Sequence, residues 1–368
     1  TPLYSSAASD VYKRQRQKDT QNSEYVDVIG WRIDEVVDLI RGEAGTEVEI
    51  EFISADSSEN ARKLITLKRE EIKLEDRAAK AEIIETDDKN KIGIIDLPSF
   101  YIDFNAYQKR TEDYKSSSND IKNILETFNE NNIDAVILDL RNNGGGALME
   151  ANKIIGLFVA SGPTVQVKNS FGQIRPYGSS KAAQVWSKPL IVLVNRYSAS
   201  ASEIVAGAIQ DYQRGIIIGQ RTFGKGTVQA LENLSKGQIK ITESKYYRVN
   251  GNSTQNKGVI PDIILPATWD IETVGESSYP TAMKWDSVIP YRHKKFDLDL
   301  NTLKDLKKLY RNRLSNEPNL SYLQKVRKRY DENKDKKFLS LNMSEREIDK
   351  ELRKSWLLDI ENTRRSLL

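Results

Sequence analysis

Two kinds of hydrophobic pattern open the chain. Apolar residues at positions 33, 36, 37 and 40 follow helical spacing, so we predict a helix with Asp34 and Arg41 at its ends. Residues 45–52 alternate apolar and acidic side chains, as a half-buried strand does, and residues 63–68 provide an antiparallel partner. Residues 1–15 show no apolar period and no signal-peptide layout. We therefore interpret residues 1–20 as a non-native or disordered leader.

A different pattern follows, in which short apolar runs alternate with helical periods. The runs at residues 91–97, 135–140, 189–194 and 215–219 indicate buried strands, and residues 118–131, 147–160 and 201–211 indicate helices. Strand, loop and helix in repetition predict an α/β fold. Strand-like pieces at residues 238–241 and 246–249 come next, and from residue 301 the chain is predicted to be a charged helical tail.

Length and charge narrow the class of protein. The 368 residues correspond to two or three domains. The 56 Lys and Arg nearly balance the 53 Asp and Glu, so the net charge is only +3, which argues against a nucleic-acid-binding protein. No apolar run reaches the ~18–20 residues that a transmembrane helix needs. We predict no nucleic-acid partner and no transmembrane segment.

Two residue counts restrict the chemistry. The chain has no cysteine, which excludes disulfides, thiolate nucleophiles and zinc-thiolate sites. Its single histidine, His293, lies in a charged segment, and a zinc site with two or three histidine ligands is excluded. A Ser-His-Asp triad would have to use that histidine. If the protein is an enzyme, we expect its base to be Lys, Asp, Glu or Tyr rather than His293.

Ser200 and Lys225 are the strongest catalytic candidates. Ser200 lies between a buried strand and a helix, where unpaired amides of the first helical turn can stabilise an oxyanion. Lys225 follows the next buried strand and has a glycine on each side. To act as a base, its amine must be neutral, which requires a pKa lowered from ~10.4 by burial or nearby positive charge. From spacing alone, a serine helix cap and a surface lysine are the favoured interpretation, because both residue types are common.

The glycines at 144–146 follow a buried strand and offer either a second oxyanion amide or an ordinary tight turn. They do not form the dinucleotide motif G-x-G-x-x-G, since Ala147 and Leu148 come next. Nearby, Asp139 and Arg141 stand at a strand end, and an ion pair that anchors the loop is the favoured interpretation.

A phosphate-binding loop is the rival interpretation of the segment around Lys225. Residues 219–225 begin like a P-loop, but Gly226 stands where the motif needs Ser or Thr, and the hydroxyl is displaced to Thr227. We therefore disfavour a nucleotide-hydrolysing enzyme.

Long motifs in the chain resemble the tail-specific proteases, also called carboxyl-terminal processing peptidases. Ser-Ala-Ser-Ala-Ser-Glu-Ile at 198–204 and Thr-Phe-Gly-Lys-Gly-Thr-Val-Gln at 222–229 resemble that family's active-site segments. Residues 138–147 resemble its glycine loop, residues 247–255 and 257–263 its later strands, and residues 28–33 the second half of its PDZ domain. Residues 285–288 and the helical tail resemble the long periplasmic branch of the family, with the N-terminal part missing.

The resemblance implies a role for each matching residue. Ser200 would be the nucleophile and Lys225 the base, Gln229 would orient the lysine amine, and Glu203 would support the site. The amides of Gly146 and Ala201 would form the oxyanion hole. The helix with ends Asp34 and Arg41 would line one side of a PDZ peptide groove. No metal or other cofactor is implied.

The expected fold is α/β, with a crotonase-like protease core, a partial PDZ domain and a helical C-terminal domain. The expected function is a serine endopeptidase that cleaves periplasmic proteins recognised by apolar C-terminal tails, in some members with a lipoprotein adaptor. The alternative is a non-catalytic PDZ-type scaffold with an inert hydrolase core. The expected boundaries are 1–20 for the leader, 21–76 for the partial PDZ domain, 77–270 for the protease core and 271–368 for the linker and helical tail.

Overall fold

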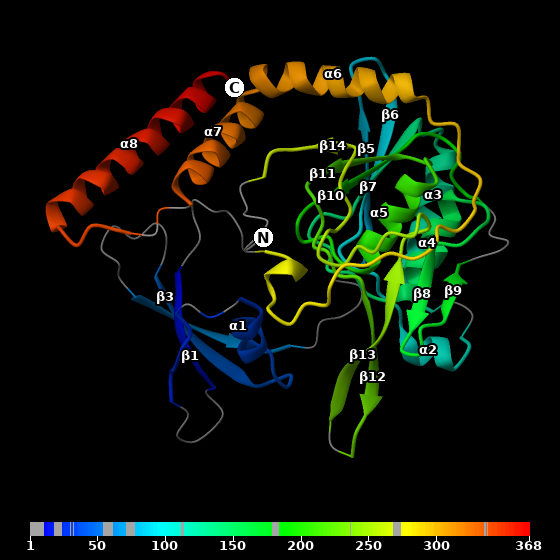
Figure 1. The fold of residues 1–368 in the computed structure, drawn as a ribbon, viewed down its shortest axis with the longest axis horizontal. Helices are drawn as coiled ribbons and strands as arrows, with labels where there is room; N and C mark the ends of the chain where they lie inside the picture. The colour runs from blue at the N-terminus through cyan, green and yellow to red at the C-terminus, as the bar shows by residue number, and fades with distance from the viewer. Residues whose placement is uncertain are drawn as a thin grey trace. The chain divides into compact units, whose positions relative to one another are not determined.

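The computed structural model describes residues 11–17, 24–29, 31, 33–53, 62–70, 78–111, 114–178, 184–235, 237–267, 274–334, 336 and 338–368. The chain divides into two compact units, Thr1–Asp76 and Arg77–Leu368. Figure 1 shows the elements of both units.

The described residues of the N-terminal unit form a four-stranded antiparallel sheet and one helix. Its strand order is β2-β1-β3-β4. The predicted helix and both predicted strands are present. The elements are β1 Val11–Gln17, β2 Val26–Asp27, α1 Ile33–Ile40, β3 Glu47–Ile53 and β4 Arg62–Lys68.

Two features of this unit differ from the prediction. Residues 1–20 were expected to hold no regular element, yet β1 pairs with β3 along six residue positions. The expectation that β3 is half-buried was also wrong, because Glu49 and Glu51 are buried along with the apolar residues. Glu49 accepts a hydrogen bond from Tyr25, and Glu51 pairs with Arg62, so the strand can bury its acidic side.

A six-stranded sheet forms the centre of the second unit. Its strand order is β14-β11-β10-β7-β6-β5, and all neighbouring strands are parallel except the β5–β6 pair, which is antiparallel. Four of these strands are the predicted apolar runs, and β5 and β14 were not predicted. The bounds are β5 Lys80–Glu85, β6 Lys91–Asp96, β7 Ala135–Asp139, β10 Leu190–Val194, β11 Ile216–Gly219 and β14 Ile263–Ile264.

Three predicted helices accompany this sheet. They are α3 Ser117–Glu130, α4 Leu148–Phe158 and α5 Ala201–Asp211, and a short helix, α2 Phe104–Gln108, precedes them. The three longer helices lie together beside the strands, with α4 in contact with both α3 and α5 (Figure 1). The α/β architecture predicted from the sequence is thus confirmed.

A second, antiparallel sheet has the strand order β12-β13-β8-β9. The two strand-like pieces predicted near residues 238 and 246 form one continuous strand, β13, and the other three strands of this sheet were not predicted. The strands are β8 Val165–Asn169, β9 Ile174–Tyr177, β12 Thr227–Asn233 and β13 Gln238–Tyr247.

Three helices form the tail: α6 Leu300–Asn316, α7 Pro318–Asn333 and α8 Met343–Ser366, after a 3₁₀ turn at Glu276–Ser278. Asp299 caps α6 by accepting hydrogen bonds from the amides of Asn301 and Thr302. Among the described residues, no helix combines the length and the apolar character that a membrane span requires.

Candidate active site

Three loops meet at the carboxyl ends of the neighbouring strands β7, β10 and β11. Asn143, in the glycine loop after β7, accepts hydrogen bonds on its carbonyl from the Ala199 amide at 3.0 Å and the Ser202 hydroxyl at 2.8 Å. The Phe223 amide, in the loop after β11, donates to the Ser198 carbonyl at 3.0 Å. The carboxyl ends of parallel strands are where ligands bind in α/β sheets, and here the predicted residues come together.

Ser200 occupies a sharp turn between β10 and α5. Its backbone has φ 55° and ψ −111°, a conformation that non-glycine residues rarely adopt. Such a position costs of order 1–3 kcal/mol, so the surrounding contacts must hold it in place. The residue is only partly buried and directly precedes the first turn of the helix.

Glu203 connects the nucleophile candidate to the base candidate. One carboxylate oxygen accepts hydrogen bonds from the amides of Ser200 and Lys225, both at 2.9 Å. The other accepts from the Thr222 hydroxyl at 2.6 Å and the Gly224 amide at 2.7 Å. Glu203 is fully buried, and burial raises its pKa to about 7 although these four donors favour the charged form.

Lys225 is held by Gln229 and has an environment that favours the neutral amine. Its Nζ donates to Oε1 of Gln229 at 2.8 Å. Burial lowers the pKa of Lys225, and the positive charge of Lys240 lowers it further. The strand β12 follows the lysine where a P-loop would begin a helix, so the phosphate-binding arrangement is absent from this segment.

The glycine loop lies against Ser200. A Cβ on Gly145, which has φ +104°, would lie 2.9 Å from Cβ of Ser200, and one on Gly146 would lie 2.2 Å from the Phe100 carbonyl oxygen. Within the described residues, neither the Gly146 amide nor the Ala201 amide donates a hydrogen bond to another protein group. These two amides are therefore available to an oxyanion beside Ser200.

Tyr246 also belongs to the site, although no sequence pattern indicated it. Its buried hydroxyl contacts the Ser200 carbonyl at 3.2 Å and donates to the Lys225 carbonyl. It comes from β13, 46 residues beyond Ser200 in the chain. Tyr246 and Glu203 thus hold the same two backbone segments from two directions.

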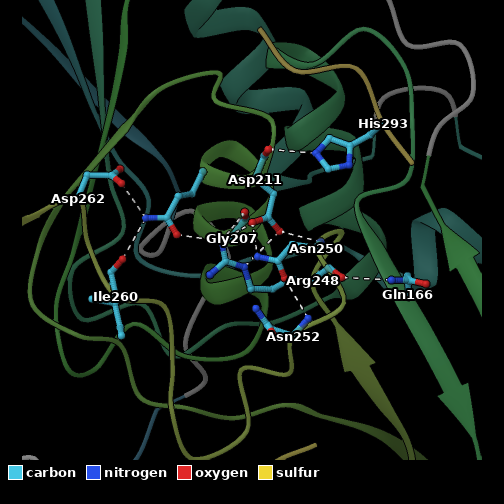
Figure 2. Close-up of polar contacts among 10 residues, drawn as sticks. Gln166, Gly207, Asp211, Arg248, Asn250, Asn252, Ile260, Asp262 and His293 are labelled. Atoms are coloured by element: carbon cyan, nitrogen blue, oxygen red, sulfur yellow. Dashed lines mark hydrogen bonds and ion pairs between the residues drawn. The ribbon is translucent and has the colours of Figure 1, made fainter. Parts of the chain in front are cut away.

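The far end of α5 is fixed by a polar network (Figure 2). The buried carboxylate of Asp211 accepts hydrogen bonds from Arg248 and, at 2.8 Å, from Asn250. His293 lies at this end too, with Nε2 3.1 Å from the Asp211 carbonyl oxygen. At ~1.5 Å rise per residue, the eleven residues from Ser200 to Asp211 place the Asp211 end of the helix roughly 16 Å from the nucleophile candidate, so a histidine in contact with that end cannot complete a triad.

The other candidates are placed as follows. Asp139 and Arg141 form the expected ion pair, in which Nε of the arginine lies 3.0 Å from both carboxylate oxygens and Nη2 donates to Oδ2 at 2.6 Å. The helix predicted between Asp34 and Arg41 is α1, in the N-terminal unit. The described ranges contain no group of three or more His, Asp or Glu side chains placed to hold a metal ion.

Comparison with known proteins gives matches over most of the chain. Peptidase family S41 matches residues 91–265, and the C-terminal domain of tail specific protease matches residues 269–368. The tail-specific protease of Haemophilus influenzae is 39% identical over 336 residues, which are 88% of this chain and 46% of that protein. The carboxyl-terminal-processing protease of Synechocystis is 34% identical over 65% of this chain and 52% of that protein. The chain thus spans about half the length of these relatives.

Among solved structures, the photosystem II D1 C-terminal processing protease superimposes with a TM-score of 0.51. It is 29% identical in sequence, and the match covers 65% of this chain and 61% of that one.

Proposed function

This chain belongs to the tail-specific proteases of peptidase family S41, and from that premise we propose that it is a serine endopeptidase with a Ser200/Lys225 dyad. The observation that supports the dyad most strongly is the carboxylate of Glu203, which binds the backbone amides of both residues. Nucleophile and base are therefore held by one buried side chain. The lowered pKa of Lys225 favours the neutral amine that a base requires.

The proposed reaction has two stages. Neutral Lys225 takes the proton from the Ser200 hydroxyl while the Ser200 oxygen attacks the peptide carbonyl. The amides of Gly146 and Ala201 stabilise the oxyanion that forms. The lysine then gives the proton to the leaving amine, which leaves an acyl group on Ser200. Water activated by Lys225 hydrolyses this ester and restores the serine. Gln229 orients the lysine amine through its 2.8 Å hydrogen bond.

The finer parts of the proposal concern the fold, the substrate and the location. We propose that the second unit has a crotonase-like core and that the N-terminal unit is a partial PDZ domain, with α1 on one side of a groove for apolar C-terminal tails. Periplasmic protein substrates and a lipoprotein adaptor belong to the same proposal. They rest on the motif resemblance of residues 28–33, 198–204 and 222–229.

The test uses purified protein and an unfolded substrate with an apolar C-terminus, with fragments followed by mass spectrometry. Wild type should cleave, and Ser200→Ala and Lys225→Ala should not. Lys109→Ala is a matched control, since it removes an exposed lysine of the same unit that lies outside the three loops of the candidate site. Cleavage that survives in both dyad variants would refute the mechanism. Substrate binding without cleavage by wild type would favour the scaffold alternative.

A further inference from the structure

A cavity of about 490 Å³ opens in the second unit between the start of α4 and the hairpin β8–β9. Leu148, Val167, Phe171, Pro176 and Tyr177 supply its apolar lining. Its size falls within the range of small-ligand pockets, which is roughly 300–1,000 Å³. None of the roles assigned above uses these residues.

Two structural connections place this cavity beside the candidate active site. Leu148 is three residues beyond Gly145, which lies against Ser200, so its Cα is within about 11 Å of the Gly145 Cα. On the other side, Val167 pairs in the sheet with Tyr246, whose hydroxyl contacts the backbone of Ser200. The two walls of the cavity are thus tied separately to the nucleophile segment.

The limit of about 11 Å between the Cα atoms of Gly145 and Leu148 restricts which part of a substrate can reach the cavity. An extended chain advances ~3.3 Å per residue, so 11 Å corresponds to about three residues. A peptide with its carbonyl at Ser200 can therefore reach the cavity with a side chain within about three residues of the scissile bond.

The residues that line the cavity indicate which type of substrate side chain would bind there. Phe171, at the turn of the hairpin, is 87% exposed, and Tyr177 on β9 is 43% exposed. Both line the cavity and leave apolar surface exposed there, which would be stabilised by contact with another apolar group. Arg175 is the one charged residue of the described lining, so a basic side chain would be repelled.

We propose that this cavity is a substrate subsite that binds a large apolar or aromatic side chain near the scissile bond. The proposal rests on the proposed peptidase function, because it takes its occupant from the chain that Ser200 would attack. It differs from the recognition of a C-terminal tail, since the side chain it selects is internal and lies next to the cleaved bond.

Binding is measured first, in the Ser200→Ala background, so that catalysis is not needed. The probes are labelled Gly/Ser peptides with a central Phe, Gly or Lys, amidated so that they offer no C-terminal carboxylate. We expect the Phe peptide to bind most tightly and the Lys peptide least. Phe171→Ala should reduce the preference for Phe over Gly about fivefold, and Tyr177→Ser should act in the same direction. The matched control is Phe338→Ala, an aromatic residue that is 90% exposed in the tail region.

Cleavage-site mapping on an unfolded protein then uses the intact dyad. Wild type should show large apolar residues enriched within about three positions of the cut, and Phe171→Ala should lose this enrichment. If wild type does not cleave but the Phe171-dependent binding holds, the peptidase function fails and the subsite stands. If wild type cleaves and neither binding nor cut positions depend on Phe171 and Tyr177, the subsite is refuted and the peptidase function stands.

Discussion

Replacing Gly145 by alanine tests whether the glycine loop holds Ser200 in place. The new Cβ would lie 2.9 Å from both the Ala199 carbonyl oxygen and the Ser200 Cβ, where 3.4–4 Å is ordinary contact. The residue has φ +104°, which alanine tolerates at a cost of about 1–2 kcal/mol. Overpacking adds about 1–3 kcal/mol.

The sum predicts a loss of about 2–5 kcal/mol in the free energy of unfolding of the second unit. For a domain of this size, that corresponds to a melting temperature lower by roughly 5–15 °C. If part of the strain is relieved by moving Ser200, the rate of peptide cleavage should fall by about tenfold to a hundredfold, because a misplacement of ~1 Å can cost a factor of 10².

Gly144→Ala is the matched control one residue away. An added Cβ there meets nothing within 4 Å, and the residue lacks a positive φ, so stability should change by less than about 0.5 kcal/mol. Differential scanning calorimetry and a fluorogenic peptide assay would measure both variants. Equal behaviour of the two variants in both assays would refute the close packing of Gly145 on Ser200.

Three further predictions concern the groups around the dyad. Gln229→Glu should raise the pKa of Lys225 by placing a negative charge near its amine, so the rise of kcat with pH should move to higher pH. A pH profile that does not move would contradict the proposal that Lys225 is the base. Tyr246→Phe should lower thermal stability by about 1 kcal/mol and reduce kcat with the pH profile unchanged, and full activity would show that the hydroxyl is dispensable. Burial raises the pKa of Glu203 from 4.5 to about 7, so the folded protein binds this proton more tightly than the unfolded chain does. Wild-type stability should therefore fall as pH rises from 4.5 to about 7, and Glu203→Gln should remove that slope in pH-dependent urea unfolding. The same variant should also lose activity, because an amide cannot accept hydrogen bonds from all four donors.

The central sheet could be predicted because parallel strands covered on both faces are continuous apolar runs. The run in β10, for example, is five apolar residues long and ends just before the Ser200 turn. The strands that were missed lack this signal. All six residues of β5 are exposed, and β9 contains Pro and Arg among its four residues. Their position depends on pairing with a neighbouring strand, which no local pattern records.

Ser200 and Lys225 could be identified as candidates because each follows a buried strand at a loop with special backbone requirements. The placement of Tyr246 could not be predicted, since it reaches the site only through the antiparallel pairing of β13 with β12 and β8. The four donors around Glu203 are likewise invisible in the sequence. Three are backbone amides, and their direction depends on how two separate loops are folded.

The shared acceptor also has a consequence for hydrogen exchange. The amides of Ser200, Gly224 and Lys225 all donate to the carboxylate of Glu203. If this side chain moves away, all three hydrogen bonds break together. Amide protons that depend on one opening event exchange with solvent at a common free energy. The two loops that carry the dyad should therefore behave as one cooperative unit of local unfolding, although Lys225 lies 25 positions beyond Ser200 in the chain.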